Sequence, residues 1–466
     1  MSRLIIVSNR VAPISEGGPA AGGLAVGVYD ALKETGGMWF GWSGDVFATP
    51  PDGITLEEHG PVTFATIGLV RRDYDQYYRG FSSATLWPAF HYRPDLIEFD
   101  RHEYDGYCRV NRWLAAQLAP LLKPDDVIWV HDYHLIPFAQ ALRALGVRNR
   151  IGFFLHIPFP APQILLSVPR HRELMEALCA FDLLGFQTGP DLRAFCDYIE
   201  TEAGGTLGRD DAQPVEIRAF GQTLRAAAYP IGVYPDEIAA LAKDCEDGHG
   251  VQIVKATLHE RKLVMSVDRL DYSKGLVEHF RAFERLIEHD PHQRNNVSFL
   301  QIAPPTRSDV DAYRDIRLQL EAESGRINGR YTELDWTPIR YILAIRAAGA
   351  GRVVLRGARG TRHAAARRHE SRGEGIRVGA GSRRSRCARA VAVRGRGARA
   401  DGRADRQSAR HRRHGRRRAR HGAQDAAGGA QGALRRDVRT IAREQRVGVA
   451  RQLPAGPENG LIAAQA

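Results

Sequence analysis

The chain has 466 residues, with 66 Lys and Arg against 54 Asp and Glu, and its formal net charge is +12 at neutral pH. The charge is uneven: residues 343–466 hold 31 Arg against 8 acidic residues, whereas residues 1–342 hold 46 acidic against 35 basic residues. The basic excess therefore belongs to the last part of the chain, and it does not indicate nucleic-acid binding by the whole protein.

Neither the first residues of the chain nor its cysteine content points to export or to a membrane. The first residues, MSRLIIVSNR, contain a four-residue apolar run that is too short for a signal peptide, and no stretch approaches the length of a membrane span. We expect a cytoplasmic protein without a membrane partner. The cysteines show no close pairing and are expected to be reduced thiols: Cys108, Cys179, Cys196, Cys245 and Cys387.

Short apolar runs alternate with helix-like segments over the first 342 residues, which is enough chain for two domains with cores of their own. The predicted strands are Leu4–Val7, Val127–Val130, Ile151–Leu155, Leu183–Gln187, Leu263–Val267 and Val297–Ile302. The predicted helices include Pro137–Leu145, Leu276–His289 and Asp309–Gly325. Because the strands lack strict alternation, we expect them to be buried on both faces, in parallel sheets. Tyr229–Pro235, with two Pro and a Gly, is predicted to cross from one sheet to the next.

In parallel sheets, ligands bind beyond the carboxyl ends of the strands. Polar residues follow the predicted strands at these ends: Asn9, Arg10, His131, Asp132, His156, Asp268, Arg269 and Arg307. We therefore expect the binding site among them.

The segment Ala20–Gly27 (AAGGLAVG) follows the first strand and opens a helix. Paired glycines there let a ligand approach the backbone and offer free amides to an anion. The spacing is that of neither a dinucleotide-binding fingerprint nor a P-loop. A plain tight turn is the alternative.

Three polar residues in VHDYHL, namely His131, Asp132 and His134, are candidates for acid–base work or metal binding. The segment lacks the acidic third ligand of zinc enzymes, so a metal is not favoured. Side chains satisfied by the backbone are the alternative. His156, in LHIPFP, is placed to bind a polar substrate, or it is a satisfied core histidine.

Arg269 and Lys274 share one predicted strand-to-helix loop, VDRLDYSKG. Two cations near a helix N-terminus can hold a diphosphate, since their charge adds to that of the free amides. An ion pair with Asp268 or Asp271 is the alternative use of these charges.

Arg307 is a third candidate cation, and a group of aromatic residues precedes all three in the chain. Tyr77, Tyr78 and Trp87 lie in DQYYRGFSSATLWPAFHYR. Aromatic faces with polar tips suit sugar rings, although core packing is the default for such residues.

Ten strings in order carry a family resemblance: LIIVSNR, AGGLAVG, WFGWSG, LWPAFHYR, WVHDYHL, GFFLHIPFP, LLGFQT, YPIGV, DRLDYSKG and RINGRY. Over residues 1–342 the chain resembles the trehalose-6-phosphate synthases, retaining glucosyltransferases of the GT-B architecture. The resemblance implies an α/β fold with two Rossmann-like domains facing a cleft. It implies an acceptor domain at 1–228, a partial donor domain at 229–342, and a tail at 343–466 that is disordered or non-native.

The same resemblance implies transfer of glucose from UDP-glucose to glucose 6-phosphate, giving α,α-trehalose 6-phosphate without a cofactor or metal. Acceptor binding would fall to Arg10, Tyr78, Trp87, Asp132 and Arg307. Donor binding would fall to Gly22, Gly23, His156, Arg269 and Lys274. The catalytic group would comprise His156, Asp132, Arg269 and Lys274. A homo-oligomer is compatible with the resemblance, which does not fix the oligomeric state.

Residues 343–466 contain no Phe, Tyr, Trp, Met or Lys, so they have little with which to build a core. Translation of GC-rich DNA out of frame produces such a composition. His363–Arg377 can be coded so that a shift of one nucleotide gives TPLRDGMNLVAKEY, and Arg403–Arg420 can be coded so that the same shift gives ALIVNPHDIDGMADAL. Both strings resemble the missing part of the family's second domain, so we expect a frameshift between Ile342 and His363.

Two other functional classes stay open at this point. The first is an inactive remnant that binds sugar phosphates without turnover. The second is a nucleic-acid-binding protein that uses the Arg-rich tail, which is less favoured because any polycation binds nucleic acid.

Overall fold

The structure, a computed structural model, describes residues 3–11, 28–29, 31–33, 35–51, 53–208, 214–232, 235–307 and 310–343. Four predictions lie outside these residues: the Ala20–Gly27 loop, Cys387, the state of the tail after Leu343, and the frameshift. No helix among the described residues is both long enough and apolar enough to cross a membrane.

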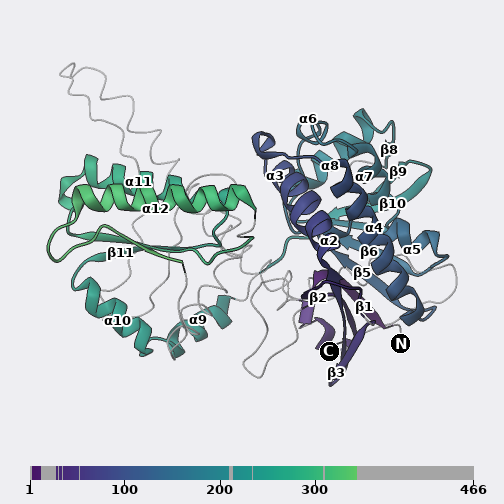
Figure 1. Ribbon diagram of the computed structural model, residues 1–466, viewed down its shortest axis with the longest axis horizontal. Coiled ribbons are helices and arrows are strands. Elements are labelled where there is room, and N and C mark those ends of the chain that lie inside the picture. Colours follow the sequence, from purple (N-terminus) through teal and green to yellow (C-terminus); the bar gives the residue numbers. More distant parts are fainter. Residues whose placement is uncertain are drawn as a thin grey trace, which may run out of the picture. The chain divides into compact units, whose positions relative to one another are not determined.

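The first sheet in the described part of the chain has ten strands, in the order β3-β4-β2-β1-β5-β6-β7-β10-β9-β8 (Figure 1). Its central strands, from β4 to β10, are parallel, whereas β3, β8 and β9 pair antiparallel at the edges. The strands are β1 (Leu4–Arg10), β2 (Gly37–Phe47), β3 (Thr55–His59), β4 (Val62–Val70), β5 (Val127–His131), β6 (Arg150–Phe154), β7 (Leu183–Phe186), β8 (Thr206–Leu207), β9 (Val215–Ala219) and β10 (Gln222–Ala228).

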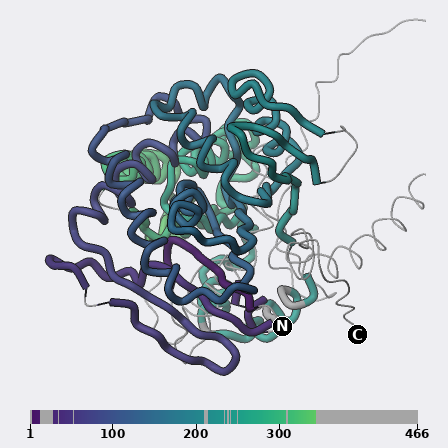
Figure 2. The backbone as a smooth tube through the Cα atoms, turned by 90° about the vertical axis from the view of Figure 1, so that its right-hand side faces the viewer, coloured from purple at the N-terminus to yellow at the C-terminus, as the bar shows by residue number. Residues whose placement is uncertain are grey.

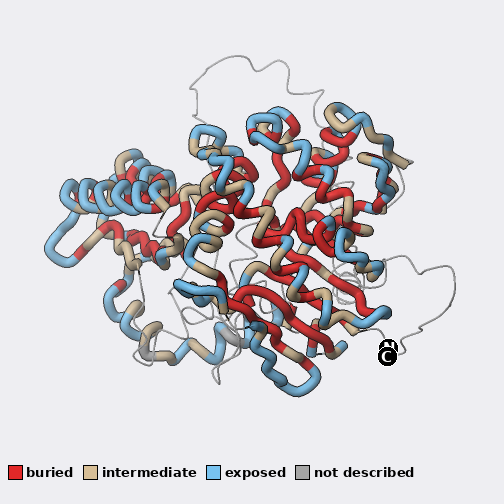
Figure 3. The backbone as a smooth tube through the Cα atoms, turned by 45° about the vertical axis from the view of Figure 1, so that its right-hand side comes forward, coloured by how far each residue is buried: buried red, intermediate tan, exposed pale blue. Residues whose placement is uncertain are grey.

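Strand β1 shows why the sheet is buried on both faces. Ile5 and Val7 pack into the large cluster on one face, and Leu4 and Ile6 pack into a separate cluster on the other. Side chains alternate between the faces of a strand, so an unbroken apolar run places apolar groups on each side. The parallel sheet with two covered faces is confirmed (Figure 3).

Helices follow the strands of this sheet and pack beside it (Figure 2). The N-cap of α4 is Asp100, whose carboxylate accepts the N–H groups of His102 and Glu103, and the N-cap of α8 is Thr188. Such caps satisfy amides that have no partner within the helix. The longer helices here are α4 (Arg101–Leu118), α5 (Phe138–Ala144), α7 (His171–Leu178) and α8 (Gly189–Thr201).

The second sheet has three parallel strands in the described residues, β11 (Lys262–Val267), β12 (Val297–Ile302) and β13 (Ile339–Ile342). Figure 1 shows α11 (Leu276–His289) and α12 (Asp311–Tyr331) side by side along one face, with α9 (Pro235–Asp244) and α10 (His249–Leu258) toward the other. Strand β10 ends at Ala228 and α9 begins at Pro235. The domain boundaries drawn from the sequence stay a prediction.

The predicted helix Leu276–His289 is confirmed, but the end predicted for the last helix is wrong. Helix α12 continues six residues past Gly325, to Tyr331, and Asp309 lies outside the described residues. The helix continues because Ile327 and Tyr331 are buried in the core of the second sheet. This burial offsets the low helix propensity of Gly325 and Gly329, which lie on the exposed face.

The core of the second sheet depends on Phe280, which is fully buried on α11 and meets the Phe299 ring edge-on at 5.9 Å. We expect Phe280→Ala to lower the free energy of unfolding of this part by about 3–5 kcal/mol, because it removes a buried ring and leaves a cavity. Leu318→Ala on α12, where the leucine is 63% exposed, is the control and should change stability by less than about 0.5 kcal/mol. Hydrogen exchange of the α11 and β12 amides checks both; equal protection in the two variants would contradict the prediction.

Candidate active site

The parallel register brings the polar strand ends of the first sheet together. Ser8 lies opposite His131 across β1 and β5, and His131 lies opposite Phe154 across β5 and β6. The residues that follow these positions, Arg10 and His156 among them, therefore gather at one edge of the sheet. This is the edge at which α/β proteins bind ligands.

A 13-residue π-helix, Tyr74–Leu86, lies next to this edge and carries two of the predicted aromatic residues. Tyr77 is fully buried, and its hydroxyl donates to Asn9 Oδ1 at 2.8 Å, so its aromatic ring belongs to the core. Tyr78 is half-buried and stacks on His134, with ring centroids 5.7 Å apart. π-helical segments are rare and occur often at functional sites.

Asp132 directly follows β5 in a backbone conformation that few residues adopt, with φ of 75°. Its carboxylate accepts the His156 N–H at 3.2 Å, and its own N–H donates to the Phe154 carbonyl at 2.8 Å. Burial raises the pKa of the Asp132 carboxyl to about 6, although the nearby cations Arg307 and Arg269 lower it. Strained residues held by such contacts cluster at functional sites.

The three histidines near this turn are buried to different degrees. His131 and His134 are buried, and burial lowers the pKa of each well below its usual value, so both rings are neutral at pH 7. His131 Nδ1 lies 2.9 Å from Nε2 of the half-buried His156. In the described part of the chain, no group of three His, Cys, Asp or Glu side chains is arranged to hold a metal ion.

The loop between β11 and α11 is built around the fully buried Asp271. Its carboxylate accepts the N–H and the hydroxyl of Ser273 at 3.0 and 2.9 Å, and the hydroxyl of Tyr313 at 3.3 Å. Burial alone would raise the pKa of Asp271, but the charges of Arg269 and Arg307 hold it below its usual value. Asp271 is therefore an anion that orders the loop and attracts two cations.

Arg269 and Lys274 both lie in this loop, as predicted. Arg269 Nη2 is 3.7 Å from Asp271 Oδ2, so the ion pair considered from the sequence is present. The Arg269 side chain is nevertheless 39% exposed, and a pair at that distance leaves its donors available to a ligand. Lys274 is half-buried, and its charge adds a smaller effect to the burial that lowers the pKa of His91.

Arg307 follows β12 and is half-buried among aromatic side chains. Its Nη1 donates to the Tyr313 hydroxyl at 2.7 Å and its Nη2 to the Tyr133 hydroxyl at 2.8 Å. The guanidinium lies 4.1 Å from the centre of the Trp87 ring. The Arg307 Nε and the Trp87 Nε1 are buried and have no partner among the described residues. Buried donors without partners are rare, so these two are candidates to bind a ligand.

Contacts between side chains join most of the predicted site residues. Arg269 lies 5.5 Å from the Trp87 ring that Arg307 also faces, and Arg307 lies 6.0 Å from the Tyr78 ring. Arg10 is exposed and lies 5.9 Å from the Trp42 ring, which in turn packs on Tyr78. Gly22 and Gly23 lie outside the described residues, so nothing places them in this group.

Four residues of the group were not predicted from the sequence as site residues: Trp42, His91, Tyr133 and Tyr313. The first three lie inside strings that the sequence singled out, so the signal was present in WFGWSG, LWPAFHYR and WVHDYHL. Tyr313 lies near the start of an ordinary amphipathic helix, and only tertiary contacts reveal its role. Burial lowers the pKa of His91 to about 4, and its Nδ1 lies 2.7 Å from the Trp87 carbonyl oxygen.

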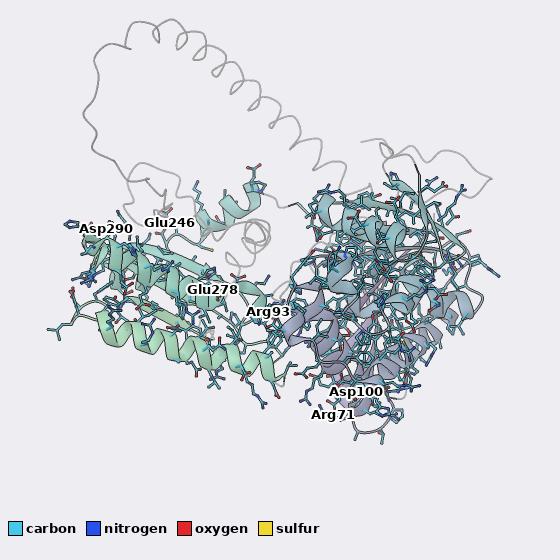
Figure 4. The ribbon with its side chains drawn as sticks, turned by 90° about the horizontal axis from the view of Figure 1, so that it is seen from above. Arg71, Arg93, Asp100, Glu246, Glu278 and Asp290 are labelled. Atoms are coloured by element: carbon cyan, nitrogen blue, oxygen red, sulfur yellow. The ribbon has the colours of Figure 1, made fainter. Side chains whose placement is uncertain are left out.

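Arg93, at the turn after α3 (Trp87–Phe90), gives a second contact between the segments that build this group. Its guanidinium lies 5.5 Å from the ring of Tyr272, the residue after Asp271. The pKa of Arg93 is raised mainly by its hydrogen bond to Asp95 and to a smaller extent by the charge of Glu278. Figure 4 labels both Arg93 and Glu278.

Cations, aromatic faces and hydroxyl groups at the ends of parallel strands suit a small molecule that carries both anionic and hydroxyl groups. Two parallel sheets with this site are the α/β architecture of GT-B glycosyltransferases, and solved structures of that class match the chain. Residues 12–347 match Glycosyltransferase family 20, and the chain belongs to that family.

Relatives from other organisms are similar over much the same part of the chain. The trehalose-6-phosphate synthase of Cronobacter sakazakii is 50% identical over 344 residues, which are 73% of this chain and 71% of that protein. The trehalose-6-phosphate synthase of Salmonella arizonae is 52% identical over 342 residues, with the same coverage.

Solved structures are similar as well. An α,α-trehalose-phosphate synthase (UDP-forming) from Burkholderia xenovorans, in complex with glucose-6-phosphate, is 75% identical, with a TM-score of 0.73 over 77% of this chain and 78% of that one. An Escherichia coli protein described as trehalose-6-phosphate, bound with UDP-2-fluoro glucose, is 47% identical, with a TM-score of 0.70 over 77% of each chain.

The raised pKa of Asp132 predicts how stability depends on pH. The unfolded carboxyl has a pKa of about 3.9, so the unfolded chain loses this proton first as the pH rises from about 4 to about 6. The contribution of Asp132 therefore favours the fold below this range and is lost across it. Asp132→Asn should remove that loss. By pH 7 the free energy of unfolding of the variant should exceed that of the unaltered chain by up to about 3 kcal/mol. Urea unfolding at several pH values checks this; parallel pH curves for the two chains would contradict it.

Proposed function

We propose that the folded part of this chain is that of a cytoplasmic enzyme that transfers glucose from UDP-glucose to glucose 6-phosphate with retention, forming α,α-trehalose 6-phosphate. The observation that carries the proposal is the placement of two guanidinium groups, those of Arg307 and Arg269, over the ring of Trp87. The names of its relatives and the ligands in their solved structures support the choice of substrates.

The acceptor, glucose 6-phosphate, is assigned to the residues around Arg307. Its phosphate would pair with Arg307 and Arg10, with Tyr78 between them and Trp87 lining the sugar. Support comes from the unpartnered donors at Arg307 and Trp87, because a buried donor gains most from a charged oxygen. Asp132 would accept hydrogen bonds from acceptor hydroxyls.

The donor, UDP-glucose, is assigned to the β11–α11 loop and to His156. Arg269 and Lys274 would neutralise the departing UDP, while His156 would contact the transferred glucose and Gly22 and Gly23 would lie against the donor. Support comes from the exposure of Arg269 beside the buried carboxylate of Asp271. This carboxylate fixes the position of the guanidinium group and leaves its N–H donors available to a ligand.

In the proposed reaction, the bond from glucose C1 to the diphosphate oxygen breaks and a bond to O1 of glucose 6-phosphate forms on the same face. The proton of that hydroxyl passes to the departing phosphate. Such a transition state gathers negative charge on the leaving group, so fixed cations lower the barrier more than they stabilise the bound substrate.

The composition of residues 343–466 bears on whether the 466-residue chain can catalyse glucose transfer. The family match ends at residue 347, and the Arg-rich composition continues beyond it. In the family, the segment like RDGMNLVAKE supplies acidic groups and amides to the donor, and this chain has no such segment. We propose that the 466-residue chain binds sugar phosphates but transfers glucose slowly or not at all.

The direct test measures UDP release from UDP-glucose and glucose 6-phosphate. A version with the reading frame restored after Ile342 is expected to produce UDP and trehalose 6-phosphate, and the 466-residue chain is expected to be at least about 100-fold slower, since charge-assisted donor contacts are lost. Calorimetric titration of both ligands separates binding from turnover. Equal turnover by both chains would refute the proposed inactivity, and no product from either would refute the function.

A second test concerns Arg307 and measures acceptor binding. Arg307→Gln should raise the KM or Kd for glucose 6-phosphate by about 100-fold, because a charged bidentate donor is lost, while that for UDP-glucose stays within about threefold. Arg307→Lys should recover only part of the affinity for glucose 6-phosphate, since an ammonium group lacks the planar pair of N–H donors of a guanidinium group. Arg285→Gln, on the exposed face of α11, is the matched control. An equal loss for both substrates would argue against an acceptor role.

A further inference from the structure

His131 is a buried polar residue that the proposed reaction does not use. It ends β5, is 1% exposed, and packs against Trp129 with ring centroids 4.4 Å apart. Its Nδ1 lies 2.9 Å from Nε2 of His156, which is hydrogen-bond distance. A hydrogen bond from this buried ring can set the orientation and the protonation of His156, which is a proposed substrate contact.

The end of β5 holds His156 at two points. Asp132 accepts the His156 main-chain N–H at 3.2 Å, which fixes the backbone. His131 meets the ring of the same residue, with ring centroids 5.2 Å apart. Because β5 and β6 are paired in register up to His131 and Phe154, the residues that follow both strands lie close together, and the two contacts form there.

A hydrogen bond between two imidazole nitrogens contains one proton, so one ring donates and the other accepts. Both rings cannot be cationic here, because burial keeps His131 neutral. The other nitrogen of His131, Nε2, is buried and has no partner among the described residues. A proton on that nitrogen would be an orphaned buried N–H, which folded proteins avoid more strictly than an unused lone pair.

We propose that His131 is a positioning residue that donates its Nδ1–H to Nε2 of His156, and so fixes His156 as the tautomer with its proton on Nδ1. In this arrangement no buried N–H of His131 is orphaned. The bond also fixes the rotation of the His156 ring, since its acceptor nitrogen must face His131.

The assignment limits what His156 can do, and it rests on the proposed contact between His156 and the transferred glucose. With Nε2 occupied and Nδ1 protonated, His156 is a hydrogen-bond donor to a hexose oxygen and not a general base. The acceptor proton must then go elsewhere, as it does in the proposed route to the departing phosphate. A partner that fixes the tautomer of a ligand-binding histidine is a common device in proteins.

The first experiment reads the tautomer without turnover. The full chain is labelled with ¹⁵N-histidine, and long-range ¹H–¹⁵N correlation spectra assign His156 by the signals missing from His156→Gln. The unaltered chain should show His156 protonated on Nδ1. His131→Leu should release it to the Nε2–H form, and His131→Asn should keep the Nδ1–H form, because the Asn amide nitrogen replaces the lost donor.

The matched control is His134→Leu, which removes another buried histidine of the same segment and should leave the His156 signals unchanged. Circular dichroism checks that each variant folds. If His131→Leu fails to fold, the unaltered chain and His131→Asn still decide the matter. An Nε2–H form of His156 in the unaltered chain, or the same tautomer in a folded His131→Leu, overturns the assignment.

The second experiment uses the frame-restored version. His131→Leu should lower kcat/KM for UDP-glucose about tenfold, while the KM for glucose 6-phosphate stays unchanged, because one positioned hydrogen bond to the donor sugar is weakened. His131→Asn should keep most of the kcat/KM that His131→Leu loses. Equal losses in the two variants would overturn the positioning role. If no version produces UDP, the proposed function fails, and the tautomer result still decides the assignment of His131.

Discussion

The site depends on keeping one cation, Arg307, half-buried at a fixed place. Removing a charge from water is costly unless hydrogen bonds and counter-charges replace the solvent. Here the hydroxyls of Tyr133 and Tyr313, the face of Trp87 and the nearby buried Asp271 do so. Because these partners come from helices and strand-end loops beside both sheets, the position of the charge requires both cores to be folded. An anionic ligand would meet a cation whose orientation is already set.

The second constraint is the register of the parallel strands β5 and β6. It sets His131, the last residue of β5, and Asp132, the next residue, against the segment that carries His156, so these two neighbours hold the ring and the backbone of that histidine. The strain at Asp132 and the burial of His131 have the same origin: the chain must turn sharply at the strand end while its polar groups find partners. Precise placement of a donor toward a sugar requires such support, because a loosely held imidazole would rotate.

The sequence predicted much of this arrangement, for identifiable reasons. Apolar runs such as LIIV and VIWV predict buried parallel strands, and the residues after them, including Asp132 and Arg269, lie in the site group. The failures have physical causes too. Tyr77 looked like a sugar-binding ring but is core, because it is fully buried against Tyr107 and its hydroxyl donates to Asn9, whereas its neighbour Tyr78 is half-buried. Helix α12 passes Gly325 because burial of Ile327 and Tyr331 outweighs local propensity.

The sequence by itself determined the fold class, the family resemblance and the residues at the strand ends, since these follow from apolar periodicity and from ordered motifs. Tertiary structure alone decided which of those residues meet. The pairing of His131 with His156 joins residues 25 apart in the chain, and the hydrogen bond from Arg307 to Tyr133 joins residues 174 apart. Such contacts depend on register, burial and side-chain direction, which exist only after the sheets have packed.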